Sequence, residues 1–243
     1  MRTLVLNALS GCSTLGCLSA GASVVGACDS NMFHQHNFPD IPVFSSKEEI
    51  RKIPHADLVM AMIQPNKVCI KIPWVCIGLM PRQIVLCTRM RQWPKWLKGM
   101  DRWNWWFDTL LAKDYGLPII SKIKFAVAFR KDIKPTFSSF PFPEAPMIKK
   151  DLSSFLDPDP KPKLYVKKEG KSILPNDLWR LSHGKRIFLK DDKGCRKLSL
   201  SETKRIWGLK DSFFVGSEET IYKEPFPLLV ADVVKEAMDW AWL

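Results

Sequence analysis

The sequence predicts an α/β protein built on a doubly wound, mostly parallel sheet with helices on both faces and a small, reduced second lobe. Five short runs are apolar along their length, and longer segments separate them, as in a parallel sheet that is covered on both faces. These runs are Leu4–Leu9, Val24–Cys28, Asp57–Met62, Gln83–Cys87 and Lys124–Phe129. Prolines recur between residues 135 and 175, which indicates an extended segment that crosses between two lobes.

Helical signals occur between and after these runs. A short helix is expected over residues 14–20, directly after the first run. Ser199 and Glu202 have the spacing of a capping box, which predicts a helix over residues 198–209. Pro227 is placed to begin a closing helix, which we expect to return to the large domain beside the N-terminal strand.

The segment 103–111 is predicted to be a helix that faces the core, because large apolar side chains recur there at three- and four-residue spacing. These side chains are Trp103, Trp106, Phe107, Leu110 and Leu111. Stacking of the aromatic rings on nucleic-acid bases is the alternative interpretation of this segment.

The composition favours a folded, basic protein. A hydrophobic fraction of 46% is enough for a core, and the formal net charge of +12 suits a polyanion such as nucleic acid. A solvated basic surface without a partner explains the charge equally well. The seven cysteines form no C-x-x-C pair and no disulfide or zinc pattern, which indicates a reduced, intracellular protein in the nucleus or cytoplasm.

An exported lipoprotein is a separate hypothesis, since residues 1–28 begin Met-Arg and end in Val25-Gly26-Ala27-Cys28. Polar residues such as Asn7 interrupt the apolar part of this stretch, which counts against a signal peptide. We expect no membrane span, because no later run approaches 18 apolar residues.

The C-terminal third resembles a conserved block of DNA cytosine-C5 methyltransferases, which reads roughly R-x-L-T-x-x-E-x-x-R-x-x-G-F-P-D-x-F. The residues that match it in register are Arg196, Leu198, Glu202, Arg205, Gly208, Asp211 and Phe213. The resemblance implies a methyltransferase-like domain at 1–144 and 201–243, and a crossing segment with a reduced target-recognition lobe at 145–200. It also implies the cofactor S-adenosylmethionine, DNA as a partner, and no metal.

Weaker matches extend this resemblance along the chain. Asp114-Tyr115-Gly116 resembles the start of the family's D-Y-G-V-P-Q block, and 140–143 (F-P-F-P) resembles the proline-rich stretch after it. Asn37-Phe38-Pro39 resembles a short block downstream of the cofactor loop. Residues 222–227 stand where the family has I-G-N-A-V-P-P, but the glycine and the asparagine are missing.

The catalytic residues of the family are absent at the corresponding positions. The family attacks C6 of cytosine with a cysteine thiolate, and a glutamate assists at N3 of a base that is flipped out of the duplex. Here Pro65 occupies the nucleophile position and Cys87 the glutamate position, in a Cys-Thr-Arg triplet that replaces E-N-V. Cys69 is the nearest substitute nucleophile, although its apolar neighbours indicate packing.

The cofactor loop is partly retained. Leu9, Ser10 and Gly11 correspond to the D-L-F-S-G-x-G loop, and Gly11 can supply its tight turn. Asp29 stands where an acidic residue would bind the ribose hydroxyls, and Glu49 is a candidate for the adenine side. A structural role for Asp29, capping a turn, is the alternative.

Arg196 and Arg205 are the candidate DNA contacts, with a structural role as the alternative for both. His34 and His36 alternate as metal ligands can, but no carboxylate or cysteine lies at ligand spacing beside them, and we expect no metal site.

The sequence therefore predicts a DNA cytosine-C5 methyltransferase-like protein that is catalytically inactive. It either retains DNA binding or acts as a non-catalytic partner of an active methyltransferase. The alternatives are an active DNA methyltransferase with Cys69 as a displaced nucleophile, and the exported lipoprotein.

Overall fold

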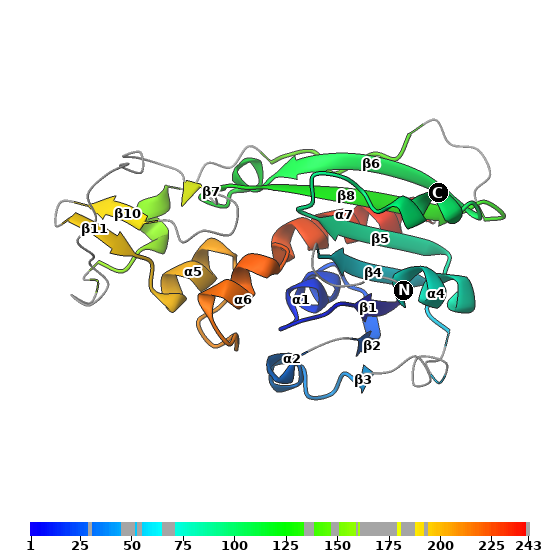
Figure 1. The fold of residues 1–243 in the computed structure, drawn as a ribbon, viewed down its shortest axis with the longest axis horizontal. Helices are drawn as coiled ribbons and strands as arrows, with labels where there is room; N and C mark the ends of the chain where they lie inside the picture. The colour runs from blue at the N-terminus through cyan, green and yellow to red at the C-terminus, as the bar shows by residue number, and fades with distance from the viewer. Residues whose placement is uncertain are drawn as a thin grey trace.

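A seven-stranded sheet forms the centre of the computed structural model (Figure 1). The structure describes residues 1–28, 31–44, 52, 55–64, 71–133, 139–146, 151–158, 160, 179–180, 188–191 and 194–241. In spatial order the strands are β3 (Val43–Phe44), β2 (Ser23–Cys28), β1 (Arg2–Leu6), β4 (Leu58–Ile63), β5 (Gln83–Thr88), β8 (Lys122–Arg130) and β6 (Trp103–Leu111).

The strands β1 to β5 pair in parallel, and β8 runs antiparallel to both β5 and β6. The chain builds outward from β1 through β2 to β3, and then returns to place β4 on the other side of β1. Strand order therefore reverses between β1 and β4. The predicted doubly wound, mostly parallel sheet is confirmed.

Both faces of the sheet are covered. The helices α1 (Cys12–Ser19) and α7 (Pro227–Trp240) pack on one face, while α4 (Lys71–Leu79) and the 3-10 helix η1 (Lys95–Gly99) pack on the other. Alternate residues of β4 belong to the two cores, because successive side chains of a strand point to opposite faces. Met60 and Met62 face α1 and α7, whereas Val59 and Ala61 face α4.

The closing helix α7 returns to the large sheet, as predicted, and packs against α1. A Cβ atom on Gly16 of α1 would lie 2.6 Å from the Cβ atom of Val230, so the close approach of the two helices requires a glycine there. The side-chain amide of Gln83 on β5 donates a hydrogen bond of 2.9 Å to the carbonyl oxygen of Ala237. This contact fixes the second half of α7 on the sheet.

The predicted capping box is confirmed at the start of α5 (Leu200–Ile206). The hydroxyl of Ser199 accepts a hydrogen bond of 3.1 Å from the N–H of Glu202, and the Glu202 carboxylate accepts one of 2.7 Å from the N–H of Ser199. The helix therefore begins where the sequence places it.

The predicted helix over 103–111 is wrong, because this segment is the edge strand β6, paired with β8 along its whole length. Its side chains alternate with the period of a strand. Trp103 and Trp105 pack in the core on the α4 face, whereas Trp106 and Leu110 pack on the α7 face. Aromatic residues favour strands, and their three- and four-residue spacing imitates a helical stripe when a strand is apolar on both faces.

Short elements complete the described chain. They are α2 (Met32–Asn37), η2 (Ala112–Tyr115), β7 (Ile119–Ile120), η3 (Leu152–Phe155), β9 (Trp179–Arg180), β10 (Phe188–Asp191), β11 (Gly194–Lys197) and α6 (Glu218–Lys223). Strand β7 pairs with β9, and β10 pairs with β11. The predicted boundaries of the second lobe stay a prediction. No helix in the described part of the chain is long and apolar enough to cross a bilayer.

Candidate functional site

The first loop, residues 7–11, follows β1 at the point where strand order reverses, which is where open α/β sheets bind ligands. Asn7, Leu9 and Gly11 all have positive φ angles, of 53°, 47° and 110°. The Asn7 side chain donates a hydrogen bond of 2.7 Å to the carbonyl oxygen of Met62 at the end of β4. The loop is therefore a fixed, tightly curled segment between the carboxyl ends of the central strands.

Gly11 is required by its surroundings as well as by its backbone angle. A Cβ atom at this position would lie 2.4 Å from Cε2 of Phe38. The neighbouring Asn37 donates a hydrogen bond of 3.0 Å to the carbonyl oxygen of Ser10 and accepts one of 2.7 Å from the N–H of Phe214. The Asn37-Phe38 block thus links the first loop to the end of the C-terminal block.

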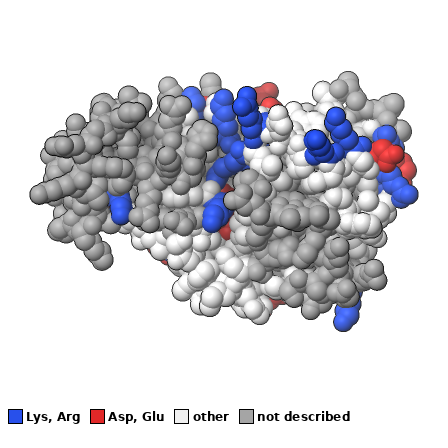
Figure 2. Space-filling view, in the orientation of Figure 1, with Lys and Arg blue, Asp and Glu red and all other residues white. Residues whose placement is uncertain are grey.

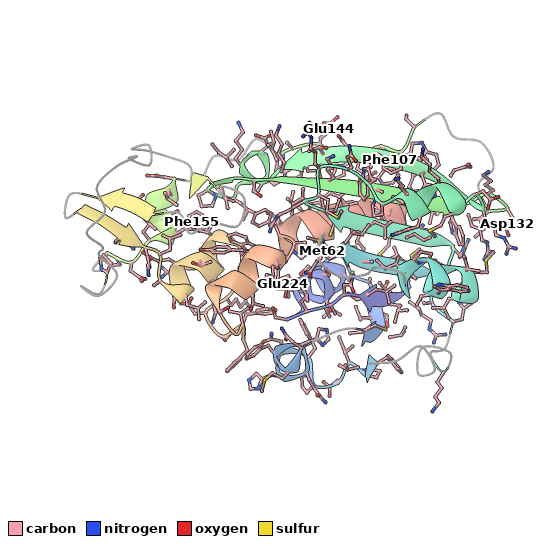
Figure 3. The ribbon with its side chains drawn as sticks, in the orientation of Figure 1. Met62, Phe107, Asp132, Glu144, Phe155 and Glu224 are labelled. Carbon is pink, nitrogen blue, oxygen red and sulfur yellow. The ribbon has the colours of Figure 1, made fainter. Side chains whose placement is uncertain are left out.

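Glu224, at the junction of α6 and α7, has its side chain directed into the first loop. Its Oε1 atom accepts a hydrogen bond of 2.6 Å from the N–H of Ser10, and the Ser10 hydroxyl donates to the same oxygen. Figure 3 shows Glu224 where α6 meets the carboxyl ends of the first strands, near Met62. The residue is completely buried, and this burial raises the pKa of its carboxyl to about 7, although the hydrogen bonds from Ser10 lower it.

Glu224 does not figure among the site residues that the sequence predicts. The available signal was a carboxylate next to Lys223, between the apolar residues Ile221 and Phe226, in the block where the family's pattern has no charged residue. A charged side chain in a buried stretch is rare unless it has a partner. Its partner, Ser10, lies 214 residues away, so no local pattern could identify it.

Arg89, the last residue of the triplet that replaces E-N-V, lies close to the same junction. Its Nη1 atom donates a hydrogen bond to the carbonyl oxygen of Tyr222, and its guanidinium lies 5.6 Å from the ring centre of Trp207 and 5.0 Å from that of Phe226. Burial lowers the pKa of Arg89 to about 10, so it stays charged at neutral pH. Its Nε and Nη2 atoms, and Oε2 of Glu224, are buried without a hydrogen-bond partner among the described residues.

The thiols near this junction are held protonated. Cys87 is completely buried, and its Sγ atom lies 3.2 Å from Sδ of Met62. Burial raises the pKa of Cys87 far above its usual range, and it does the same for Cys12, where Glu224 adds to the effect. A buried, neutral thiol cannot donate a proton to a base in the way that a carboxylic acid does.

The structure brings together one part of the predicted site. Leu9, Ser10 and Gly11 form the first loop, and Cys87 lies at the end of β5. Pro65, Cys69, Asp29 and Glu49 lie outside the residues that the structure describes. Their assigned positions stay predictions.

The two candidate DNA contacts are both ion-paired. The Arg196 guanidinium forms two hydrogen bonds of 2.8 Å to Glu202, and the two side chains are only 2% and 0% exposed. Arg205 pairs with Asp157 at a more accessible position, which lowers the pKa of that carboxyl. For Arg196 the observed contact is the structural alternative, and DNA contact by either arginine stays a prediction.

The two histidines of α2 have different environments. The Nε2 atom of His34 lies 2.9 Å from the Thr14 hydroxyl, and burial lowers the pKa of the imidazole to about 4. The ring of His36 packs on that of Phe214, with centroids 3.7 Å apart. Among the described residues, no group of three histidine, cysteine, aspartate or glutamate side chains could hold a metal ion.

The first loop, as folded, does not fit the carboxylate of S-adenosylmethionine. In a βα turn of this kind, the N–H groups at the start of the helix bind an anionic group of the ligand. The N–H of Ser10 is instead bonded to the buried carboxylate of Glu224. A ligand carboxylate would have to displace Glu224.

Solved structures of methyltransferases share this fold. The Dnmt2 methyltransferase of S. pombe superposes with a TM-score of 0.70 at 12% identity, over 98% of both chains. A mutant of DNMT2 from Spodoptera frugiperda gives 0.75 at 12% identity, over 98% of this chain and 99% of the other. A putative DNA modification methyltransferase encoded within an E. coli prophage gives 0.73 at 15% identity, over 98% and 99%.

No protein-family model and no curated protein match the sequence. The solved structures show that the chain shares the fold of these methyltransferases over 98% of its length.

Proposed function

We propose that this chain is a methyltransferase-fold protein that binds nucleic acid and does not transfer a methyl group. The observation that carries the proposal is the environment of Cys87, at the position where the resemblance requires a glutamic acid. A buried thiol packed on Met62 cannot protonate or hold N3 of a cytosine. Pro65, at the nucleophile position in the sequence, has no side chain that could attack C6.

A group of cations at the ends of β5 and β8 supports binding of a polyanion. Lys122 and Lys124 lie two residues apart on β8 and therefore point to the same face of the sheet. The Lys124 ammonium donates a hydrogen bond of 2.5 Å to the carbonyl oxygen of Arg91, which follows β5. We call Arg91, Lys122 and Lys124 the basic edge.

The basic edge lies beside the carboxyl end of β5, the side of the sheet on which the first loop also lies. In the view of Figure 2, Lys and Arg side chains gather on the surface over the ends of β6 and β8. Such a group contacts phosphates without reading sequence, and its effect on affinity is salt-dependent. It supplies the cations that the buried Arg196 does not offer in this structure.

The test combines a binding measurement with a trapping measurement. Fluorescence anisotropy of a labelled DNA duplex should show binding that weakens between about 50 and 200 mM salt. The double variant K122A/K124A should weaken binding about tenfold and reduce the salt slope by roughly 2, at about 0.9 for each phosphate that is no longer neutralised. The matched control K131A/K235A removes two exposed lysines elsewhere and should leave binding unchanged.

Trapping separates a silent protein from an enzyme with a displaced nucleophile. A duplex that contains a mechanism-trapping cytosine analogue forms a covalent adduct only with a thiolate enzyme. We expect no adduct in the presence of S-adenosylmethionine. An adduct that disappears in C69A would show an active methyltransferase. In the anisotropy measurement, equal DNA affinity of K122A/K124A and K131A/K235A would reject the basic edge as the nucleic-acid contact.

A further inference from the structure

The N-terminus of α1 lacks a cap from its own sequence. Gly11 occupies the N-cap position and forms no side-chain cap bond, and the first turn of α1, which the structure describes in full, has no acidic residue. Free N–H groups and the positive end of the helix dipole attract an anion at such a position. Glu224, distant in sequence, places a carboxylate beside this position, where it is bonded to the N–H and the hydroxyl of Ser10, one residue before the N-cap.

The backbone around Glu224 is held in place on both sides. Arg89 donates to the carbonyl oxygen of Tyr222, and the indole N–H of Trp207 donates to that of Glu224 at 3.4 Å. The side-chain amide of Gln64, after β4, donates to the carbonyl oxygen of Lys223 at 3.5 Å. The carboxylate therefore reaches the loop from a junction that contacts the ends of β4 and β5.

Only one oxygen of this buried carboxylate is satisfied. Oε1 accepts the bonds from Ser10, while Oε2 has no partner among the described residues. A buried oxygen without a partner destabilises the folded state, and more so when it carries charge. The side chain thus occupies the anion position of the loop at a cost in stability.

We propose that Glu224 is an internal occupant of the anion position in the first loop, and that it excludes the carboxylate-bearing arm of S-adenosylmethionine. The chain's own carboxylate and that of a ligand would compete for the same Ser10 donor, and two carboxylates at one position repel each other. Exclusion applies to the amino-acid arm alone, since the contacts of Glu224 are with the loop beside that arm. This inference goes beyond nucleic-acid binding, which does not depend on it.

Calorimetric titration of the full chain with two ligands tests the proposal. S-adenosylmethionine carries the amino-acid arm, and 5′-methylthioadenosine lacks its carboxylate and ammonium. We expect E224A to bind S-adenosylmethionine at least about tenfold more tightly than the unmodified protein, with no comparable gain for 5′-methylthioadenosine. The control D239A removes an exposed carboxylate from α7 and should change neither affinity.

The variant E224Q keeps the shape of the side chain and removes its charge, so it guards against a folding defect in E224A. Near-UV circular dichroism checks the fold of each variant, and E224Q should gain affinity in the same direction by a smaller factor. The unmodified protein offers a further measurement, because Glu224 becomes neutral as the pH falls through its pKa of about 7. Affinity for S-adenosylmethionine should therefore rise between pH 8 and pH 6.

The other ionisable groups near Glu224 keep one charge state over this pH range. Arg89 stays protonated with a pKa of about 10, and His34, which contacts the loop at Gly11, stays neutral with a pKa of about 4. Burial keeps Cys12 and Cys87 as neutral thiols. Tight binding of S-adenosylmethionine by the unmodified protein, or no gain in folded E224A or E224Q, would overturn the proposal, while DNA binding by the basic edge would stand.

Discussion

The carboxylate of Glu224 accepts hydrogen bonds from both the N–H and the hydroxyl of Ser10, although 214 residues separate the two in the chain. The contact joins the turn after the first strand to the start of the closing helix. It places a buried acidic group where related folds bind an anionic ligand group. The protonation state of the Glu224 side chain should therefore affect both the stability of the fold and the access of an anionic ligand to the first loop.

The first prediction concerns the pH dependence of stability. Folding raises the pKa of Glu224 from 4.5 to about 7, so between these values the folded state binds more protons than the unfolded state. The free energy of unfolding should therefore fall as the pH rises through this window, by about 3 kcal/mol for this group, and the loss is complete above pH 7. Urea unfolding at pH 5 and pH 8 measures it.

The variant E224Q should not show this fall, because its amide does not titrate. Relative to the unmodified protein, E224Q should therefore have a higher free energy of unfolding at pH 8 than it has at pH 5. D239N, at an exposed position on α7, serves as the control. An equal pH dependence in E224Q and the unmodified protein would show that Glu224 has an ordinary pKa in the folded state.

The second prediction separates the two ion pairs that Arg196 and Arg205 form. Arg196 and Glu202 are buried together, so R196M should lower the free energy of unfolding by about 3 to 5 kcal/mol by leaving an unpaired buried carboxylate. Arg205 and Asp157 are each about a third exposed, and R205M should cost at most about 1 kcal/mol. The double variant R196M/E202Q should recover much of the loss, since no buried charge remains and the glutamine oxygen can still accept from the N–H of Ser199. Similar losses in R196M and R205M in urea unfolding would contradict this ranking.

The capping box and the edge strand show what the sequence could and could not reveal. Ser199 and Glu202 were identifiable because the interaction spans three residues and satisfies local backbone groups. The spacing from Trp103 to Leu111 was misleading, because a strand with large apolar side chains on both faces has no uniformly polar side to mark its period. Glu224 was hidden for a third reason, since its partner is assigned by the fold and not by neighbouring residues.

The third prediction tests the tight turn of the first loop with a matched pair of glycines. Gly11 and Gly21 both have positive φ angles, of 110° and 83°, but only Gly11 has Phe38 within contact distance of an added Cβ atom. Gly21→Ala should cost about 1 to 2 kcal/mol, from backbone strain alone. Gly11→Ala should cost roughly 1 to 3 kcal/mol more, from crowding against the ring. Adding F38A should relieve that excess in the Gly11 variant alone, and equal costs at the two glycines would show that Phe38 yields freely.

The fourth prediction distinguishes the two faces of β6. Trp106 packs edge-to-face with Phe129 and Trp240, at centroid distances of 6.0 and 5.6 Å, whereas the adjacent Phe107 is 50% exposed. W106A should therefore lower the free energy of unfolding by about 3 to 5 kcal/mol, and F107A by a much smaller amount. The two residues would lie on neighbouring positions of one stripe if the segment were helical, and their losses would then be alike. Urea unfolding of both variants, with a comparable denaturant slope, decides between an alternating strand and a helix, because only the strand places adjacent side chains on opposite faces of the sheet.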